Sequence, residues 1–187
     1  MSERYDDEWI AMLLDGESRL GRAAPRELLA DAGVRESDTL VDIGCGPGFL
    51  TFPAAQVVGP AGHVYAVDIE QKMVDLVRTR AAEQGLDHVT TLVGSGGSVP
   101  LPDGSADFAI TALILHYQPD DVVRLRLLRD VRRVLRPGGR MLVIDRLLGS
   151  EAVGALLAEA GLEHGEPRPM RENAYRFIAA RPAAAPQ

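Results

Sequence analysis

The sequence predicts an α/β fold: a doubly wound, mostly parallel sheet with helices on both faces and an antiparallel last strand. Short apolar runs alternate with amphipathic helical segments, which is the pattern of a parallel sheet covered on both sides. A glycine-rich turn follows the first apolar run, at the edge where such sheets bind ligands. The last two strand-like runs are joined by only a few residues, which suits a hairpin and makes the final strand antiparallel.

Seven segments have the composition of strands. The first five are β-branched and apolar, as expected of buried parallel strands. The last two form the proposed hairpin. In chain order the segments are 39–44, 63–68, 89–94, 107–113, 140–145, 162–170 and 174–181.

Helical segments fill the connections between these strands. The longest, 119–139, repeats apolar residues at every fourth position and is expected to stop at Pro137-Gly138-Gly139. The segment 150–161 follows the fifth strand. The other helical segments are 50–58, with Pro53 in its first turn, and 70–85, which ends at a glycine.

The length of 187 residues fits a single domain with its own core. Within it, residues 1–35 are expected to form an N-terminal helical lid segment, 36–181 the α/β core and 182–187 a disordered tail. The net charge of −7 opposes long-range attraction to nucleic acid and to anionic membranes, so small molecules are the expected partners.

Cys45 is the one cysteine, which excludes an internal disulfide and a multi-cysteine metal cluster, and no metal site is expected. The N-terminal stretch is acidic and does not resemble a secretory signal. No apolar run approaches the roughly 18–20 residues of a membrane span. Together these features predict a cytoplasmic location.

Several candidate site residues lie at strand ends, with the spacing that one nucleoside-like ligand requires. The loop glycines follow the first strand and let a ligand approach the backbone closely. Asp68 ends the second strand, where an acid bonds a ribose diol in dinucleotide folds. The other candidates are expected to contact the base or the reacting end of the ligand. The candidates, apart from Asp68, are Gly44, Gly46 and Gly48 in the loop, Ile69 and Met73 after the second strand, Gly94 and Ser95 after the third, and Leu113 after the fourth.

Asp42 decides which ligand fits this loop. It stands two residues before Gly44, where the polyphosphate of NAD or ATP would meet a like charge in a cleft of low dielectric. S-adenosyl-L-methionine has an adenosine but no phosphate, and it carries a positive ammonium and a positive sulfonium. A carboxylate beneath the loop therefore favours S-adenosyl-L-methionine as the cofactor.

Four stretches carry a family resemblance: "VDIGCGPGF", "VYAVDIEQKM", "PLPDGSADFAITALILHY" and "LRDVRRVLRPGGRMLVID". In order and spacing, across about 40–145, they resemble the motifs of class I S-adenosylmethionine-dependent methyltransferases. The likeness is to small-molecule enzymes of the ubiquinone and menaquinone biosynthesis group.

The resemblance implies a seven-stranded, Rossmann-like sheet with its last strand antiparallel. It also implies a division of the cofactor among the candidate residues. The methionine end would be lined by Asp42, Gly44, Cys45, Gly46 and Gly48, the ribose would be bound by Asp68, and the adenine would be flanked by Ile69 and Met73.

Two positions depart from the family pattern. The residue after Gly94 is usually acidic and accepts a hydrogen bond from the adenine amino group, whereas here it is Ser95, a weaker acceptor. The link 146–150, which often carries acceptor-binding residues, is short. The mouth of the site is therefore expected to be open, or to be covered by the N-terminal helices or by the second subunit of a homodimer.

His116 and Tyr117 follow the fourth strand, beside the expected position of the transferring methyl group. His116 could act as a general base, or it could only hydrogen-bond a neighbouring loop. Cys45 is expected to be a small packing residue rather than a nucleophile. The arginines of 119–139 favour a solvated helix face over a nucleic-acid patch.

The expected function is transfer of a methyl group to a small-molecule acceptor by in-line displacement, with release of S-adenosyl-L-homocysteine. Two alternatives stay open: a nicotinamide-dependent oxidoreductase, which Asp42 disfavours, and a non-catalytic S-adenosylmethionine-binding protein. Arsenic methylation, which needs several thiols, is excluded by the single cysteine.

Overall fold

The computed structural model describes residues 25–170 and 174–183. One eight-stranded sheet forms its centre, in the order β3-β2-β1-β4-β5-β8-β6, with β7 also paired to β8. Strands β1 to β5 are parallel and β8 is antiparallel to β5, which confirms the predicted sheet. The strands are β1 (Thr39–Ile43), β2 (His63–Asp68), β3 (Val89–Val93), β4 (Ala106–Ala112), β5 (Leu135–Asp145), β6 (Glu163–His164), β7 (Arg168–Pro169) and β8 (Tyr175–Ala180).

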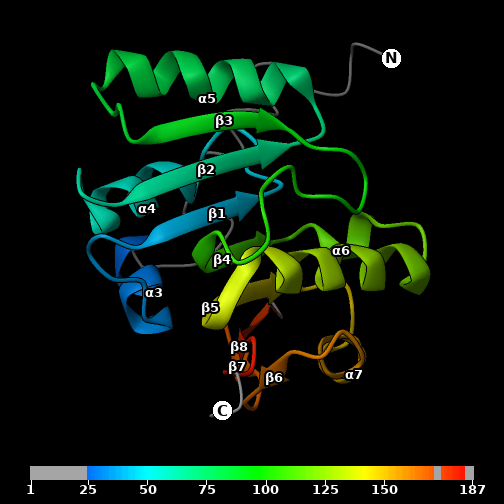
Figure 1. Cartoon of the computed structure of the whole chain (residues 1–187). Helices are drawn as coiled ribbons and strands as arrows, with labels where there is room; N and C mark the ends of the chain where they lie inside the picture. The colour runs from blue at the N-terminus through cyan, green and yellow to red at the C-terminus, as the bar shows by residue number, and fades with distance from the viewer. Residues whose placement is uncertain (1–24, 171–173, 184–187) are drawn as a thin grey trace.

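Helices cover both faces of this sheet (Figure 1). Successive strand residues point to opposite faces. Leu40 and Phe108 pack with α3 and α4, whereas Val41 and Ala109 pack with α6 and α7. The helix α5 joins α4 on the first face. The helices are α3 (Pro25–Ala32), α4 (Thr51–Val58), α5 (Gln71–Glu83), the 3₁₀ turn η1 (Leu115–Tyr117), α6 (Asp121–Val134) and α7 (Ser150–Glu159).

The strand order places a topological switch point beside β1. From β1 the chain proceeds to β2 and β3 on one side, and β4 then returns to the other side of β1. At such a point the two neighbouring connections leave in opposite directions, and a crevice opens outside the carboxyl ends of the strands. The glycine loop, 44–48, lies at this crevice.

The strand β5 begins earlier than predicted, because α6 ends at Val134 and not at the proline and glycines of 137–139. Leu135 already has an extended backbone and pairs with Ala106. The residue before a proline disfavours helical backbone, and Pro137 cannot donate to a helical bond. The turn of 137–139 is instead part of the strand, where Gly138 and Gly139 exchange backbone hydrogen bonds with Arg181.

The predicted strand 162–170 is split into β6 and β7, which gives eight strands where seven were expected. Both pieces pair with β8 in the antiparallel direction, so the predicted hairpin is present. From His164 to Arg168 the chain advances four residues, while the partners Ala179 and Arg176 are three apart. One extra residue therefore bulges between the two pieces, where glycine and proline interrupt the ladder.

The expected lid and tail lie largely outside the described residues. Of the segment 1–35, only the part from Pro25 on is described, and α3 within it packs against α4. Of the tail 182–187, residues 184–187 are not described.

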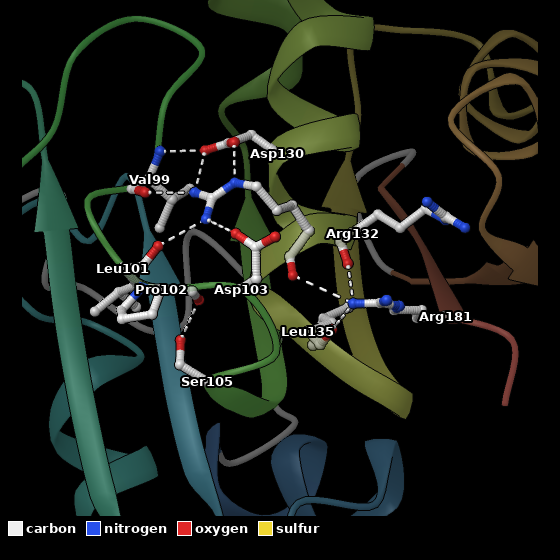
Figure 2. A network of polar contacts seen from close by, with 10 residues as sticks. Val99, Leu101, Pro102, Asp103, Ser105, Asp130, Arg132, Leu135 and Arg181 are labelled. Carbon is white, nitrogen blue, oxygen red and sulfur yellow. Dashed lines mark hydrogen bonds and ion pairs between the residues drawn. The ribbon is translucent and has the colours of Figure 1, made fainter. Parts of the chain in front are cut away.

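Arginines of α6 hold the polypeptide backbone rather than forming only a solvated face. Arg133 uses all three of its side-chain nitrogens, donating to the carbonyls of Val99 and Leu101 and to the carboxylates of Asp103 and Asp130. Figure 2 shows these bonds. They fasten the long β3–β4 connection to α6.

Substitution of Arg133 tests this attachment. Arg133→Met keeps the aliphatic stem but removes the bonds to the two carbonyls and the ion pairs with Asp103 and Asp130. We expect the free energy of unfolding to fall by about 2 kcal/mol, measured by urea denaturation, because hydrogen bonds to charged groups carry that order of stability. Arg129→Met is the control, since Arg129 is exposed and pairs with Glu159 at 3.4 Å; its cost should stay below about 0.5 kcal/mol. Equal losses in the two variants would contradict the attachment.

Candidate functional site

The glycine loop after β1 is tied to the end of β2. The backbone N–H groups of Gly44 and Cys45 both donate to the carbonyl of Val67, at 2.8 and 3.1 Å. Gly44 and Gly46 have φ angles of 71° and 52°, which favour glycine. A Cβ on Gly44 would lie 2.4 Å from Ile114 Cγ2, whereas one on Gly46 would meet no atom within 4 Å. Gly46 therefore presents its backbone to open space.

Cys45 and Gly48 form the packed side of the same loop. A Cβ on Gly48 would lie 2.4 Å from the ring of Phe52, and Gly48 lines neither of the two cavities at this edge. Burial raises the pKa of the Cys45 thiol well above its usual range, and the charges of Asp42 and Asp68 add to the effect. The thiol is therefore neutral, as suits a packing residue.

Asp42 is a buried carboxylate beneath the loop, 3% exposed. Its Oδ2 accepts a hydrogen bond of 2.6 Å from the hydroxyl of Thr51. Burial raises the pKa of Asp42 to about 6; the bond from Thr51 opposes this shift and the charge of Asp68 adds to it. Asp42 lines a cavity of about 20 Å³ together with Gly44 and Leu113, a volume that admits one water molecule. A cation at this place would offset the cost of burying the charge.

Asp68 connects the loop, the second strand and the following helix. Its Oδ2 accepts a bond of 2.8 Å from the N–H of Gly46, and its Oδ1 accepts one of 3.0 Å from the N–H of Glu70. Glu70 is the N-cap of α5, which has no side-chain capping bond. Asp68 thus bonds the turn before the helix, and it also lines the main cleft.

A cleft of about 720 Å³ opens at the carboxyl ends of β1 to β4. This volume is typical of sites that enclose a small organic ligand. Asp42 and Cys45 line the adjoining small cavity instead. The predicted site residues that line the cleft are Gly44, Gly46, Asp68, Ile69, Met73, Gly94, Ser95, Leu113 and Tyr117.

Leu113 occupies a strained position where the two cavities meet. Its φ is 59°, a left-handed value that is uncommon for a residue with a side chain. The bond from its N–H to the carbonyl of Ile144, at 2.8 Å, holds it there. Strained backbone of this kind concentrates at functional sites.

Several residues that line the cleft were not among the predicted site residues. Glu70 directly follows the Asp68–Ile69 pair, and the small residues after Ser95 continue the same loop. Their position next to predicted site residues could have identified them. The missed lining residues include Glu70, Gly96, Gly97, Ser98, Ile114 and Gln118.

Asp145 is a further missed residue, and it holds His116. Its carboxylate is fully buried and lies 3.1 Å from Nδ1 of His116. It also accepts hydrogen bonds from the N–H groups of residues 146, 147 and 148. The signal was present in the sequence, because β5 ends in an acid just as β2 does. His116 itself lines neither cavity, and only 7% of its side chain is exposed.

Tyr117 forms part of the outer rim on the same side. It is 74% exposed and lines the cleft, and its ring centroid lies 4.2 Å from that of the His116 ring, with the two planes tilted by 43°. Ile69 also lines the cleft and is 65% exposed. Exposed apolar side chains at the mouth of a cleft favour an organic binding partner.

Over residues 25–170 and 174–183, no group of three or more His, Cys, Asp or Glu side chains is arranged to hold a metal ion. In the same ranges, every helix is too short or too polar to cross a bilayer.

Comparison with known proteins gives a consistent assignment. Residues 40–139 match the family described as methyltransferase domain. An arsenite methyltransferase of Halobacterium salinarum is 36% identical over 147 residues, covering 77% of this chain and 36% of that protein. A demethylmenaquinone methyltransferase of Anoxybacillus flavithermus is 28% identical over 120 residues, covering 64% of this chain and 49% of that protein. The chain thus spans less than half the length of these curated relatives.

Solved structures share the whole architecture. The crystal structure of a SAM dependent methyltransferase from Aquifex aeolicus superposes with a TM-score of 0.85 at 25% sequence identity, covering 95% of this chain and 100% of that one. The sheet order, the glycine loop at the switch point and the match over 40–139 agree with one another. The chain therefore belongs to the methyltransferase domain family, as its resemblance to the class I S-adenosylmethionine-dependent enzymes predicted.

Proposed function

We propose that this chain is an S-adenosylmethionine-dependent methyltransferase that acts on a small-molecule acceptor and releases S-adenosyl-L-homocysteine. The observation that carries the proposal is Asp42, a buried carboxylate beneath a glycine loop at the head of the cleft. A polyphosphate at this loop would be repelled by it, whereas an ammonium group would be attracted. The names of the relatives support the reaction class, and the name of the Aquifex structure supports both the cofactor and the reaction class.

The residues present fit the cofactor over its length. Gly46 offers open backbone at the methionine end, and the cavity beside Asp42 has room for a bridging water. Asp68 is 9% exposed and lines the cleft, where its carboxylate can meet the ribose hydroxyls. Ile69, 65% exposed, and Met73, buried in the wall, offer apolar surface to a flat base.

When bound, S-adenosylmethionine supplies an electrophilic methyl group to a nucleophilic acceptor. The task of the chain is to hold the acceptor in line and to exclude water. Tyr117 contacts the acceptor from the rim of the cleft, and His116 positions Tyr117 through the contact between their rings. This positioning role is proposed for His116 in place of the general base, because His116 lines neither cavity and its Nδ1 lies 3.1 Å from the buried carboxylate of Asp145.

The N-terminal segment is proposed as a lid over this mouth. Ile69 and Tyr117 leave large apolar areas exposed beside the cleft, and residues 1–24 carry Tyr5, Trp9 and Leu13 at helical spacing. A second subunit is the alternative cover. Arsenite, which appears in the name of one relative, is not proposed as the acceptor of this chain, because Cys45 is the one cysteine of the sequence and is buried.

Methyl transfer is tested with isotopically labelled S-adenosylmethionine and a panel of acceptors, including a demethylmenaquinol analogue, simple phenols, amines and thiols. We expect label in one acceptor class, with an equal amount of S-adenosyl-L-homocysteine released. Cofactor binding without transfer to any acceptor would favour the non-catalytic alternative. Binding of NADH in place of S-adenosylmethionine would favour the oxidoreductase.

Asp68→Ala tests the ribose contact. We expect S-adenosyl-L-homocysteine to bind about 10–100-fold more weakly by isothermal titration, because the bonds of a carboxylate to the diol are lost. The control is Asp75→Ala on α5, where the exposed carboxylate pairs with Arg78 at 2.7 Å. This variant should bind within twofold of the wild type, and equal binding by Asp68→Ala would overturn the ribose assignment.

Asp42→Asn separates stability from binding. Because folding raises the pKa of Asp42 from 3.8 to about 6, the wild type loses stability as pH rises through this window, and the variant does not. We therefore expect the variant to unfold with a free energy roughly 1–3 kcal/mol higher at pH 7.5, and with little difference below pH 4. The amide oxygen can still accept from Thr51.

The same variant should bind S-adenosyl-L-homocysteine about tenfold more weakly at pH 7.5, because the ammonium group loses its counter-charge. Chemical denaturation across pH and isothermal titration give the two readings. A variant that is less stable at pH 7.5, or that binds as tightly as the wild type, would show that Asp42 has only a structural role.

A further inference from the structure

The tight hairpin turn of residues 94–98, which follows β3, lies at the end of the cleft that would receive the purine base, here called the base end. Asp68 lies between the glycine loop and this hairpin, since β2 pairs with both β1 and β3. A ribose at Asp68 with its methionine end toward Gly46 therefore directs the base toward residues 94–98, which line the same cleft. This step rests on the proposed cofactor.

Ser95 supplies a hydroxyl at that edge and no carboxylate. It is the first residue after Gly94, it is exposed, and it lines the cleft. Of the described residues that line the cleft, Asp68 and Glu70 are the carboxylates. Both oxygens of Asp68 accept backbone N–H groups, and Glu70 stands at the start of α5 on the ribose side.

Backbone hydrogen bonds and packing against α6 hold this turn in place, so that the position of Ser95 does not depend on its own side chain. The N–H of Ser98 donates to the carbonyl of Ser95 at 2.7 Å. A Cβ on Gly97 would lie 2.8 Å from Arg126 Cδ, which shows how closely α6 packs there. The N–H of Val99 donates to Asp130 at 2.6 Å, within the network of Figure 2.

A hydroxyl and a carboxylate select different bases. An ionised carboxylate only accepts hydrogen bonds, so it favours the amino group of adenine and repels the oxo group of hypoxanthine. A serine hydroxyl both donates and accepts, and it rotates to suit its partner. We propose that Ser95 lets the base end accept a purine with either an amino or an oxo group at C6, so that S-inosyl ligands bind as well as S-adenosyl ligands.

The experiment compares S-adenosyl-L-homocysteine with S-inosyl-L-homocysteine by isothermal titration against the full chain. For the wild type we expect the two dissociation constants to agree within about threefold. Ser95→Asp should favour the adenosyl ligand by about tenfold or more, the order expected for a hydrogen bond to a charged group gained with one base and opposed with the other. The matched control, Val93→Asp, places the same charge two residues earlier, on an exposed side chain at the end of β3 that does not line the cleft, and should leave the ratio within threefold.

Each outcome has a separate meaning. A wild-type preference above tenfold for the adenosyl ligand overturns the inference, and loss of that preference in Glu70→Gln would identify Glu70 as the selecting residue. A change of ratio in Val93→Asp but not in Ser95→Asp overturns the role of Ser95. No heat with either ligand overturns the proposed function and this inference with it, whereas tight binding of the adenosyl ligand alone overturns only the inference.

Discussion

Buried carboxylates at the carboxyl ends of strands hold the functional edge of this protein together. Asp68 at the end of β2 fixes both the glycine loop and the turn into α5, and Asp145 at the end of β5 fixes the chain that follows it and His116. Parallel strands leave their loops at one edge of the sheet, where few regular backbone partners remain. Carboxylate oxygens, which accept several N–H groups each, supply those partners. The shape of the cleft depends on these few side chains.

The helix α6 makes the complementary contribution, because it supplies donors to carbonyls. Arg133 holds the carbonyls of Val99 and Leu101, and Arg124 holds those of Leu115 and Gln118. These carbonyls belong to the connections after β3 and after β4, the two segments that close the cleft on its outer side. A planar guanidinium suits this task better than an ammonium group, since its donors point in fixed directions. One helix thus positions both of these connections.

The sequence predicts the sheet and much of the lining of the cleft, because strands, helices and the glycine loop have strong local signals. Nine of the predicted residues line the cleft. It fails where a long-range partner decides. Leu135 leaves the helical pattern because it pairs with Ala106 and because Pro137 follows. The contact of Asp145 with His116 was missed because the two residues lie 29 positions apart. Hydrophobic periodicity carries no information on either contact.

Asp42 and Asp145 show that burial alone does not mark a ligand site. Asp145, fully buried, is surrounded by backbone N–H groups and His116, so its charge is already satisfied inside the protein. Asp42 receives a bond from Thr51 and faces a cavity, and burial raises its pKa to about 6. Ionising a buried carboxyl group whose pKa is raised in this way costs stability at physiological pH. A fold that only needed a packed core would place an amide or an apolar side chain there. The cost is understandable if the cation that Asp42 meets arrives with the ligand, and this makes Asp42 the residue that relates the stability of the fold to its function.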